Sequence, residues 1–140
     1  MSSPLEIATH RYQHAARELA AAAKELRRLS AAGLDPAARP EVQIIQRVVS
    51  DHFRMPVDLL WRRDKHEPIV TARMQAMVIT RRITQLSFQE IATAYKRDHG
   101  TVMSAVTSVA NRCDTDARYR AAFEQLLAKC ERELAVEEAA

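Results

Sequence analysis

The stretch Lys96–Val102, KRDHGTV, places charged and hydrogen-bonding side chains directly before an apolar-periodic segment. In a DNA groove, a carboxylate accepts from cytosine N4, an imidazole donates to a base, and a threonine methyl contacts thymine. The N-terminus of a helix adds an attraction for phosphate. Asp98 is also a residue type that caps helices, so the sequence leaves two roles open for it: capping the helix and contacting a base.

A short helix is predicted on each side of this turn. Ser87 and Glu90 have the three-residue spacing of a capping box and open the first helix. Its inner face carries Ile91, Ala92 and Tyr95. Beyond the turn, apolar residues again recur at helical spacing, at Val102, Ala105, Val106 and Val109. Two helices joined by a tight polar turn predict a helix-turn-helix, whose second helix enters the major groove.

The rest of the chain is also predicted to be helical, which makes the fold all-α. Ser3, Pro4 and Glu6 open a helix that we expect to run to about Ala31 and to stop at Gly33. Three further helices are predicted over 40–53, 56–61 and 69–86, with an exposed charged loop over 62–68. Asp114-Thr115 is expected to cap a last helix that carries Tyr119, Phe123, Leu126, Leu127 and Leu134. The predicted organisation is an N-terminal amphipathic helix (1–33), a linker (34–40) and a DNA-binding domain (41–136).

The composition excludes several classes of function. Two glycines, Gly33 and Gly100, are too few and too far apart for a P-loop or a dinucleotide fingerprint, so no nucleotide is expected. His10 and His14 have the spacing of two metal ligands but lack a third, and no catalytic constellation is visible. We therefore expect no enzyme activity, no metal and no cofactor. Two cysteines without a CxxC pair, and no apolar run of about 20 residues, predict a cytoplasmic protein. As a DNA-binding protein, it is expected to be nucleoid-associated.

The distribution of charge along the chain and an apolar stripe on the first predicted helix indicate which partners the protein could bind. Residues 41–112 hold eleven Lys or Arg against seven Asp or Glu, which suits a nucleic-acid surface, whereas the C-terminal segment is acidic. In the first helix, large residues recur every seven positions with small ones alongside: Leu5, Tyr12, Leu19 and Leu26, with Ala8, Ala15, Ala22 and Leu29. This narrow stripe fits a close-packed helix pair, formed either with the chain's own C-terminal helix or in a homodimer.

Residues 42–112 resemble the C-terminal DNA-binding domain (domain IV) of the bacterial replication initiator DnaA. The matching segments, in order, are Val42 to Phe53, Val57 to Leu60, Arg73 to Met77, Ile83 to Ile91 and Arg97 to Val102. The last of them, an Arg-Asp-His-x-Thr-Val motif after a capped helix, is the most specific. The resemblance implies a Trp-repressor-like helix-turn-helix, to which this chain adds a long N-terminal helix and a C-terminal helix.

The resemblance also implies a second contact surface. The family's equivalent basic loop sends an arginine into the minor groove, a role that fits Arg62 or Arg63. Arg73 matches the family's arginine at the start of the long helix, and Arg81 and Arg97 are expected near phosphates. The expected DNA-binding residues are Arg62, Arg63, Lys65, Arg73, Arg81, Arg97, Asp98, His99, Gly100 and Thr101.

Three departures from the family pattern qualify this expectation. Gly100 stands where the family usually has a base-reading threonine, Asp64 and Glu67 dilute the basic loop, and the ATP-binding motor domain is not present in the chain. The sequence therefore predicts a small replication- or transcription-related regulator that binds double-stranded DNA at DnaA-box-like sites. One alternative is a protein-interaction module that kept the fold but lost specific DNA binding. A transposase-associated subunit would need a nuclease carboxylate cluster, which the sequence does not show.

Overall fold

A computed structural model describes residues 3–30 and 35–139, and the chain divides into two compact units, 1–34 and 35–140. The first unit contains one helix, α1 (Pro4–Ser30). The Glu6 N–H donates to Ser3 Oγ and the Ser3 N–H donates to Glu6 Oε2, both at 3.1 Å, so the predicted capping box is confirmed. The predicted stop at Gly33 lies outside the described residues.

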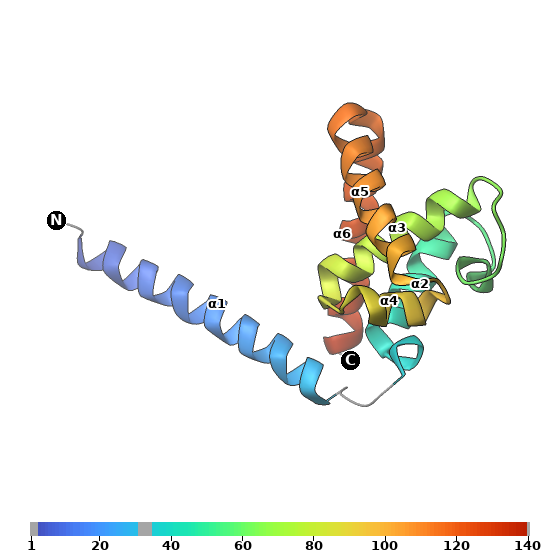
Figure 1. The fold of residues 1–140 in the computed structure, drawn as a ribbon. Coiled ribbons are helices and arrows are strands. Elements are labelled where there is room, and N and C mark those ends of the chain that lie inside the picture. Colours follow the sequence, from blue (N-terminus) through green and yellow to red (C-terminus); the bar gives the residue numbers. More distant parts are fainter. Residues whose placement is uncertain (1–2, 31–34, 140) are drawn as a thin grey trace. The chain divides into compact units, whose positions relative to one another are not determined.

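The second unit is built from five α-helices and two short 3₁₀ helices, and no strand occurs in the described residues. In chain order these are η1 (Pro36–Ala38), α2 (Pro40–His52), η2 (Val57–Leu60), α3 (Ile69–Thr84), α4 (Phe88–Tyr95), α5 (His99–Thr115) and α6 (Ala117–Ala139). Figure 1 shows them by label. The all-α prediction is confirmed, and η1 lies inside the segment predicted as a linker.

Helix α3 is the centre of this unit, because it contacts α2, α4, α5 and α6. Four of its apolar side chains are almost completely buried, at Ala72, Ala76, Met77 and Ile79. The helix ends at Thr84, two residues earlier than predicted, because Gln85 adopts a left-handed conformation with φ of 56°. Leu86 is buried beyond this end, so its apolar side chain belongs to the core without belonging to the helix.

Helices α5 and α6 form a hairpin and run side by side (Figure 1). The predicted cap at Asp114-Thr115 is wrong, because α5 continues through Thr115. Asp116 has the extended backbone that an N-cap needs, and its Oδ1 accepts from the Arg118 and Tyr119 N–H groups at 3.0 and 3.1 Å. The buried face of α6 then carries Phe123, Leu126, Cys130 and Leu134.

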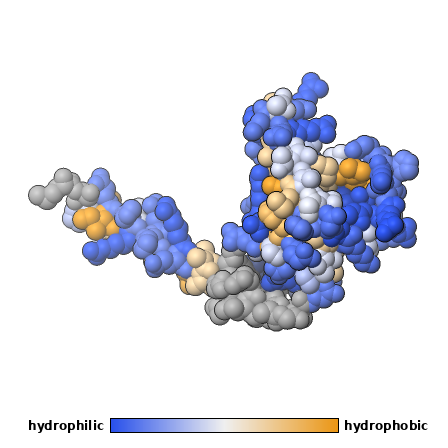
Figure 2. All heavy atoms as spheres, viewed as in Figure 1, coloured by the Kyte–Doolittle hydropathy of each residue, from blue (hydrophilic) through white to orange (hydrophobic). Residues whose placement is uncertain are grey.

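Hydrophilic side chains cover most of the second unit on the face shown in Figure 2. In the parts of the chain that the structure describes, no helix is both long enough and apolar enough to cross a membrane.

Candidate nucleic-acid interface

Three residues, Lys96, Arg97 and Asp98, make the turn between α4 and α5. Lys96 has φ of 53°, and the Arg97 N–H donates to the Ala92 carbonyl at 2.9 Å, which is the bond of a Schellman end. Asp98 follows in an extended conformation as the N-cap of α5. The turn is therefore held by short-range backbone bonds, and it points α5 away from α4 within a few residues.

Asp98 organises the first turn of α5. Its Oδ1 accepts from both the N–H and the hydroxyl of Thr101, each at 2.8 Å, so the structure gives Asp98 the capping role. These two hydrogen bonds stabilise the ionised carboxylate and lower the pKa of Asp98. His99, Gly100 and Thr101 are exposed at this end of the helix. Because the Thr101 hydroxyl is bound to Asp98, its side chain is fixed in one rotamer.

The loop between η2 and α3, residues 61–68, is here called the basic loop. Arg73 of α3 is only 6 % exposed and holds this loop from inside. Its Nε donates to the carbonyl of Leu60, its Nη1 to that of Asp64, and its Nη2 to those of Leu59 and Arg62, at 2.9–3.0 Å. Burial lowers the pKa of Arg73, and the nearby charge of Arg97 lowers it further. Arg73, which was expected among the DNA-binding residues, is thus a mostly buried residue that shapes the loop.

Arg97 connects the turn to the basic loop. Its guanidinium donates to the carbonyls of Lys96, Trp61 and Arg62. The Arg62 carbonyl therefore accepts from two arginines, Arg73 on one helix and Arg97 beside another. This junction joins residues 35 positions apart in the chain, and no local pattern in the sequence predicts it.

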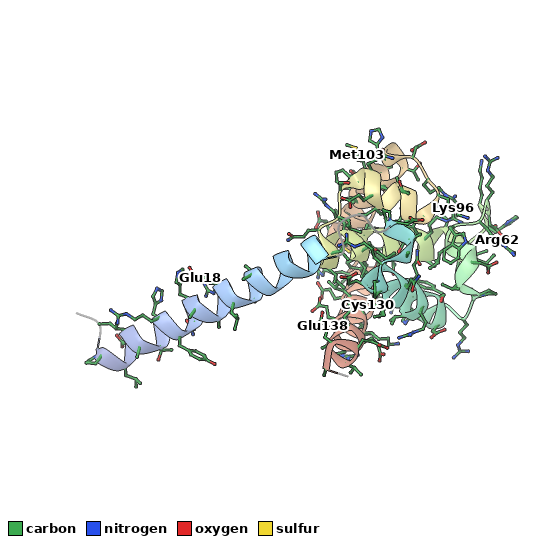
Figure 3. All side chains as sticks on the ribbon, turned by 90° about the horizontal axis from the view of Figure 1, so that it is seen from below. Glu18, Arg62, Lys96, Met103, Cys130 and Glu138 are labelled. Carbon is green, nitrogen blue, oxygen red and sulfur yellow. The ribbon has the colours of Figure 1, made fainter. Side chains whose placement is uncertain are left out.

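A groove of about 910 Å³ lies between the basic loop and the start of α5. Six of the predicted site residues line it: Arg63, Lys65, Arg73, Arg97, Asp98 and Thr101. Lys96 and His66, which are not among the residues predicted to bind DNA but lie beside them in the turn and the loop, line the same groove. Figure 3 labels Lys96 of the turn, which lines the groove, and Arg62 of the basic loop, which does not.

Residues 42–109 match the family described as bacterial dnaA protein helix-turn-helix. This segment is similar to a DnaA-type helix-turn-helix, and the unit that contains it is here called the DnaA-type domain. The chain is similar to the chromosomal replication initiator protein DnaA of Deinococcus deserti (34 % identical over 89 residues, 64 % of this chain and 20 % of the relative). It is also similar to that of Flavobacterium psychrophilum (34 % over 80 residues, 56 % and 17 %) and of Acinetobacter baumannii (37 % over 87 residues, 61 % and 19 %). The chain spans about a fifth of the length of these relatives.

The arginines of the DnaA-type domain differ in what they already bind. Arg62 is paired with Asp58, with 2.7 Å between Nη2 and Oδ2, whereas Arg63 is exposed and lines the groove near Arg97. Arg81 of α3 donates to the Leu86 carbonyl, and its Cζ lies 4.6 Å from the centre of the Phe88 ring. Arg81 therefore links α3 to the start of α4. Of the predicted residues, Arg62, Arg81, His99 and Gly100 are outside the groove lining.

The acidic residues of the basic loop are engaged in local bonds. Asp64 Oδ1 accepts from the His66 N–H at 2.9 Å and lies 2.8 Å from His66 Nδ1, and these bonds lower the pKa of Asp64. Glu67 accepts from the hydroxyl of Thr71 at the start of α3. Both carboxylates therefore stabilise the conformation of the loop, and they also reduce its positive charge.

The exposed face of α5 continues beyond its first turn. Thr101, Ser104 and Ser108 line a second, smaller groove of about 260 Å³ between α5 and α3, together with Arg97. Their spacing of three and four residues places them on one face of the helix. The sequence reading missed both serines, although this periodicity would have identified them as neighbours of Thr101.

Proposed function

We propose that the DnaA-type domain binds double-stranded DNA in a sequence-specific way. The start of α5 enters the major groove, where His99, Gly100 and Thr101 meet base edges. The basic loop contacts the adjacent minor groove, and the cations around the groove contact phosphates. The observation that carries this proposal is the junction at the Arg62 carbonyl, which holds the loop and the start of α5 beside one cationic groove.

Arg63 is the proposed minor-groove residue, in preference to Arg62. An arginine that enters the minor groove must give up its other contacts. Arg62 has an ion pair with Asp58, while Arg63 lies exposed beside Arg97. Burial lowers the pKa of Arg97 and the charge of Arg63 lowers it further, because two positive charges lie close together here. Phosphates or a narrow minor groove would neutralise these charges.

The proposed role is that of a non-enzymatic regulator of replication or transcription that recognises DnaA-box-like sites. It is supported by the resemblance to replication initiators over the helix-turn-helix segment. The proposed place of action is the bacterial nucleoid. The second candidate remains a protein-interaction module, and Gly100 supports it, because the residue offers no side chain to a base.

We also propose that two copies of the chain associate through α1. Leu5, Tyr12 and Leu19 lie one heptad apart on this helix, and each is more than 70 % exposed. Figure 2 shows hydrophobic residues among hydrophilic ones along α1. An apolar stripe of this spacing is stabilised when a second helix covers it.

A titration of DNA binding against salt, with duplexes first selected from a random pool, tests the main proposal. The logarithm of the affinity should fall with that of the salt concentration, with a slope of about −0.9 for each phosphate contact. His99→Ala and Thr101→Ala should each reduce discrimination between selected and random duplexes by about 1–3 kcal/mol. Equal weakening on both duplexes would make these residues positioning contacts. No binding to any duplex at low salt would favour the protein-interaction module.

A further inference from the structure

His66 lines the cationic groove, and its position in the basic loop is fixed by Asp64. Asp64 Oδ1 accepts from the backbone N–H of His66 at 2.9 Å and lies 2.8 Å from Nδ1 of the imidazole ring. These two hydrogen bonds lower the pKa of Asp64, so its carboxylate is ionised at neutral pH. An ionised carboxylate only accepts hydrogen bonds, and Nδ1 must therefore carry a proton. The contact selects the tautomer of the neutral ring that has its proton on Nδ1.

The second ring nitrogen, Nε2, is available to a ligand, because 90 % of the His66 side chain is exposed. In the neutral tautomer Nε2 has a lone pair and accepts hydrogen bonds, as phosphate oxygens also do, so it cannot bind a phosphate. In the protonated ring Nε2 carries a hydrogen and part of the positive charge, and it donates to a phosphate oxygen. Binding of one proton thus makes this position suitable for a phosphate.

The charges around His66 oppose its protonation in the free protein. The ionisable residues that line the groove with it come from the basic loop, from α3 and from the turn before α5: Arg63, Asp64, Lys65, Arg73, Lys96, Arg97 and Asp98. Cations outnumber carboxylates in this set, and Asp98 is engaged in capping α5. Glu67, which follows His66 in the chain, is bound to the hydroxyl of Thr71. Phosphates of a bound duplex would reverse the balance of charge at the groove.

We infer that His66 is a phosphate-binding residue of the groove that takes up a proton when DNA binds, an inference that rests on the DNA binding proposed above. The DNA complex then holds more protons than the free protein, so the affinity for DNA rises as pH falls through the range in which histidine titrates, about pH 6.5. One proton changes the affinity by at most about ten-fold per pH unit. Because the contact is exposed, we expect binding to be about five-fold tighter at pH 5.5 than at pH 7.5.

His99 is the other histidine beside the proposed DNA contacts, because it is exposed at the start of α5 and outside the groove lining. The two positions differ in what they would meet. A phosphate contact by His66 strengthens binding to every duplex alike, whereas a base contact by His99 changes the discrimination between duplexes. A phosphate contact also adds to the salt dependence, so the slope of log affinity against log salt should steepen by about 0.9 at the lower pH.

Salt titrations of the full-length chain on a random-sequence duplex, at pH values of about 5.5 and 7.5 on either side of the histidine range, test this role. His66→Asn keeps an N–H donor for Asp64 but has no atom in place of Nε2, so the five-fold gain and the steeper slope should both disappear. His66→Lys is charged at both pH values, so it should bind more tightly than the unmodified chain at the higher pH and show little pH dependence. His99→Asn is the matched control and should keep the pH dependence.

The outcomes separate this inference from the proposed function. Equal pH dependence in the unmodified chain and in His66→Asn would overturn the inference, and so would loss of the dependence in His99→Asn but not in His66→Asn. DNA binding by the unmodified chain that is the same at both pH values would also overturn it, and would leave the proposed function intact. Absence of binding to any duplex at low salt, at either pH, would instead refute the proposed function.

Discussion

The turn before α5 and the basic loop lie on the same groove but are held in different ways. The turn is shaped by bonds between residues no more than five positions apart, such as Asp98 with Thr101 and Arg97 with Ala92. The basic loop is shaped by Arg73, whose bonds to carbonyls of η2 and of the loop span nine to fourteen positions. A local device follows from residue types and spacing, whereas a long-range one depends on the finished fold. The basic loop therefore depends on a long-range side chain, Arg73, in addition to its local bonds, whereas local bonds shape the turn.

Removal of the Arg73 side chain should disrupt the conformation of the basic loop and leave that of the turn before α5 unchanged. Arg73→Ala leaves the carbonyls of Leu59, Leu60 and Asp64 without this donor, so the free energy of unfolding should fall by about 3 kcal/mol. Chemical denaturation measures this loss. The control is Arg63→Ala, which removes the same charge from an exposed position and should change stability by less than about 0.5 kcal/mol.

The same two variants separate shape from charge in DNA binding. Both should weaken binding, but in NMR spectra only Arg73→Ala should broaden or shift the amides of residues 61–68. Equal stability of the two variants would show that Arg73 does not hold the loop, and the contrast between loop and turn would then fail.

The variant Gly100→Thr tests the other half of the comparison, the turn and the start of α5. A Cβ atom at Gly100 would have Asp98 Oδ1 as its nearest neighbour at 3.5 Å, an ordinary contact, so the variant should fold. The added methyl and hydroxyl should change discrimination at one base pair by about 1 kcal/mol. Selection of duplexes by the two proteins measures this change. Gly100→Ala is the control for helix propensity, and an equal shift with alanine would assign the effect to the helix itself.

The smallest expected effect concerns pH. Hydrogen bonds from Thr101 lower the pKa of Asp98, so its cap stabilises the fold above the ordinary carboxyl pKa of 3.8 and is lost as pH falls through the lower folded pKa. The Thr101 amide should therefore titrate in NMR with a midpoint below 3.8. Asp98→Asn keeps an acceptor and should abolish the titration. A midpoint at or above the ordinary value would show that the cap does not form in solution.

The success of prediction from sequence follows the same division between local and long-range features. The capping boxes at Ser3 and Ser87 were predictable because both partners lie within one helical turn. The cap of α6 was misplaced because Asp114, Thr115 and Asp116 are adjacent, and only backbone conformation distinguishes them. The burial of Arg73 could not be predicted from the sequence, since it depends on where the carbonyls of η2 and the loop come to lie.

The two arginines that share the Arg62 carbonyl have a consequence for DNA shape. In the proposed DNA complex, α5 in the major groove and the basic loop in the minor groove are joined through the Arg62 carbonyl, so neither can shift along the duplex alone. The distance between the two contacts is set by the protein, and the duplex must match it through its twist and groove width. Base steps that the protein never touches will therefore affect affinity, because flexible steps adapt to a fixed spacing at lower energetic cost than stiff ones.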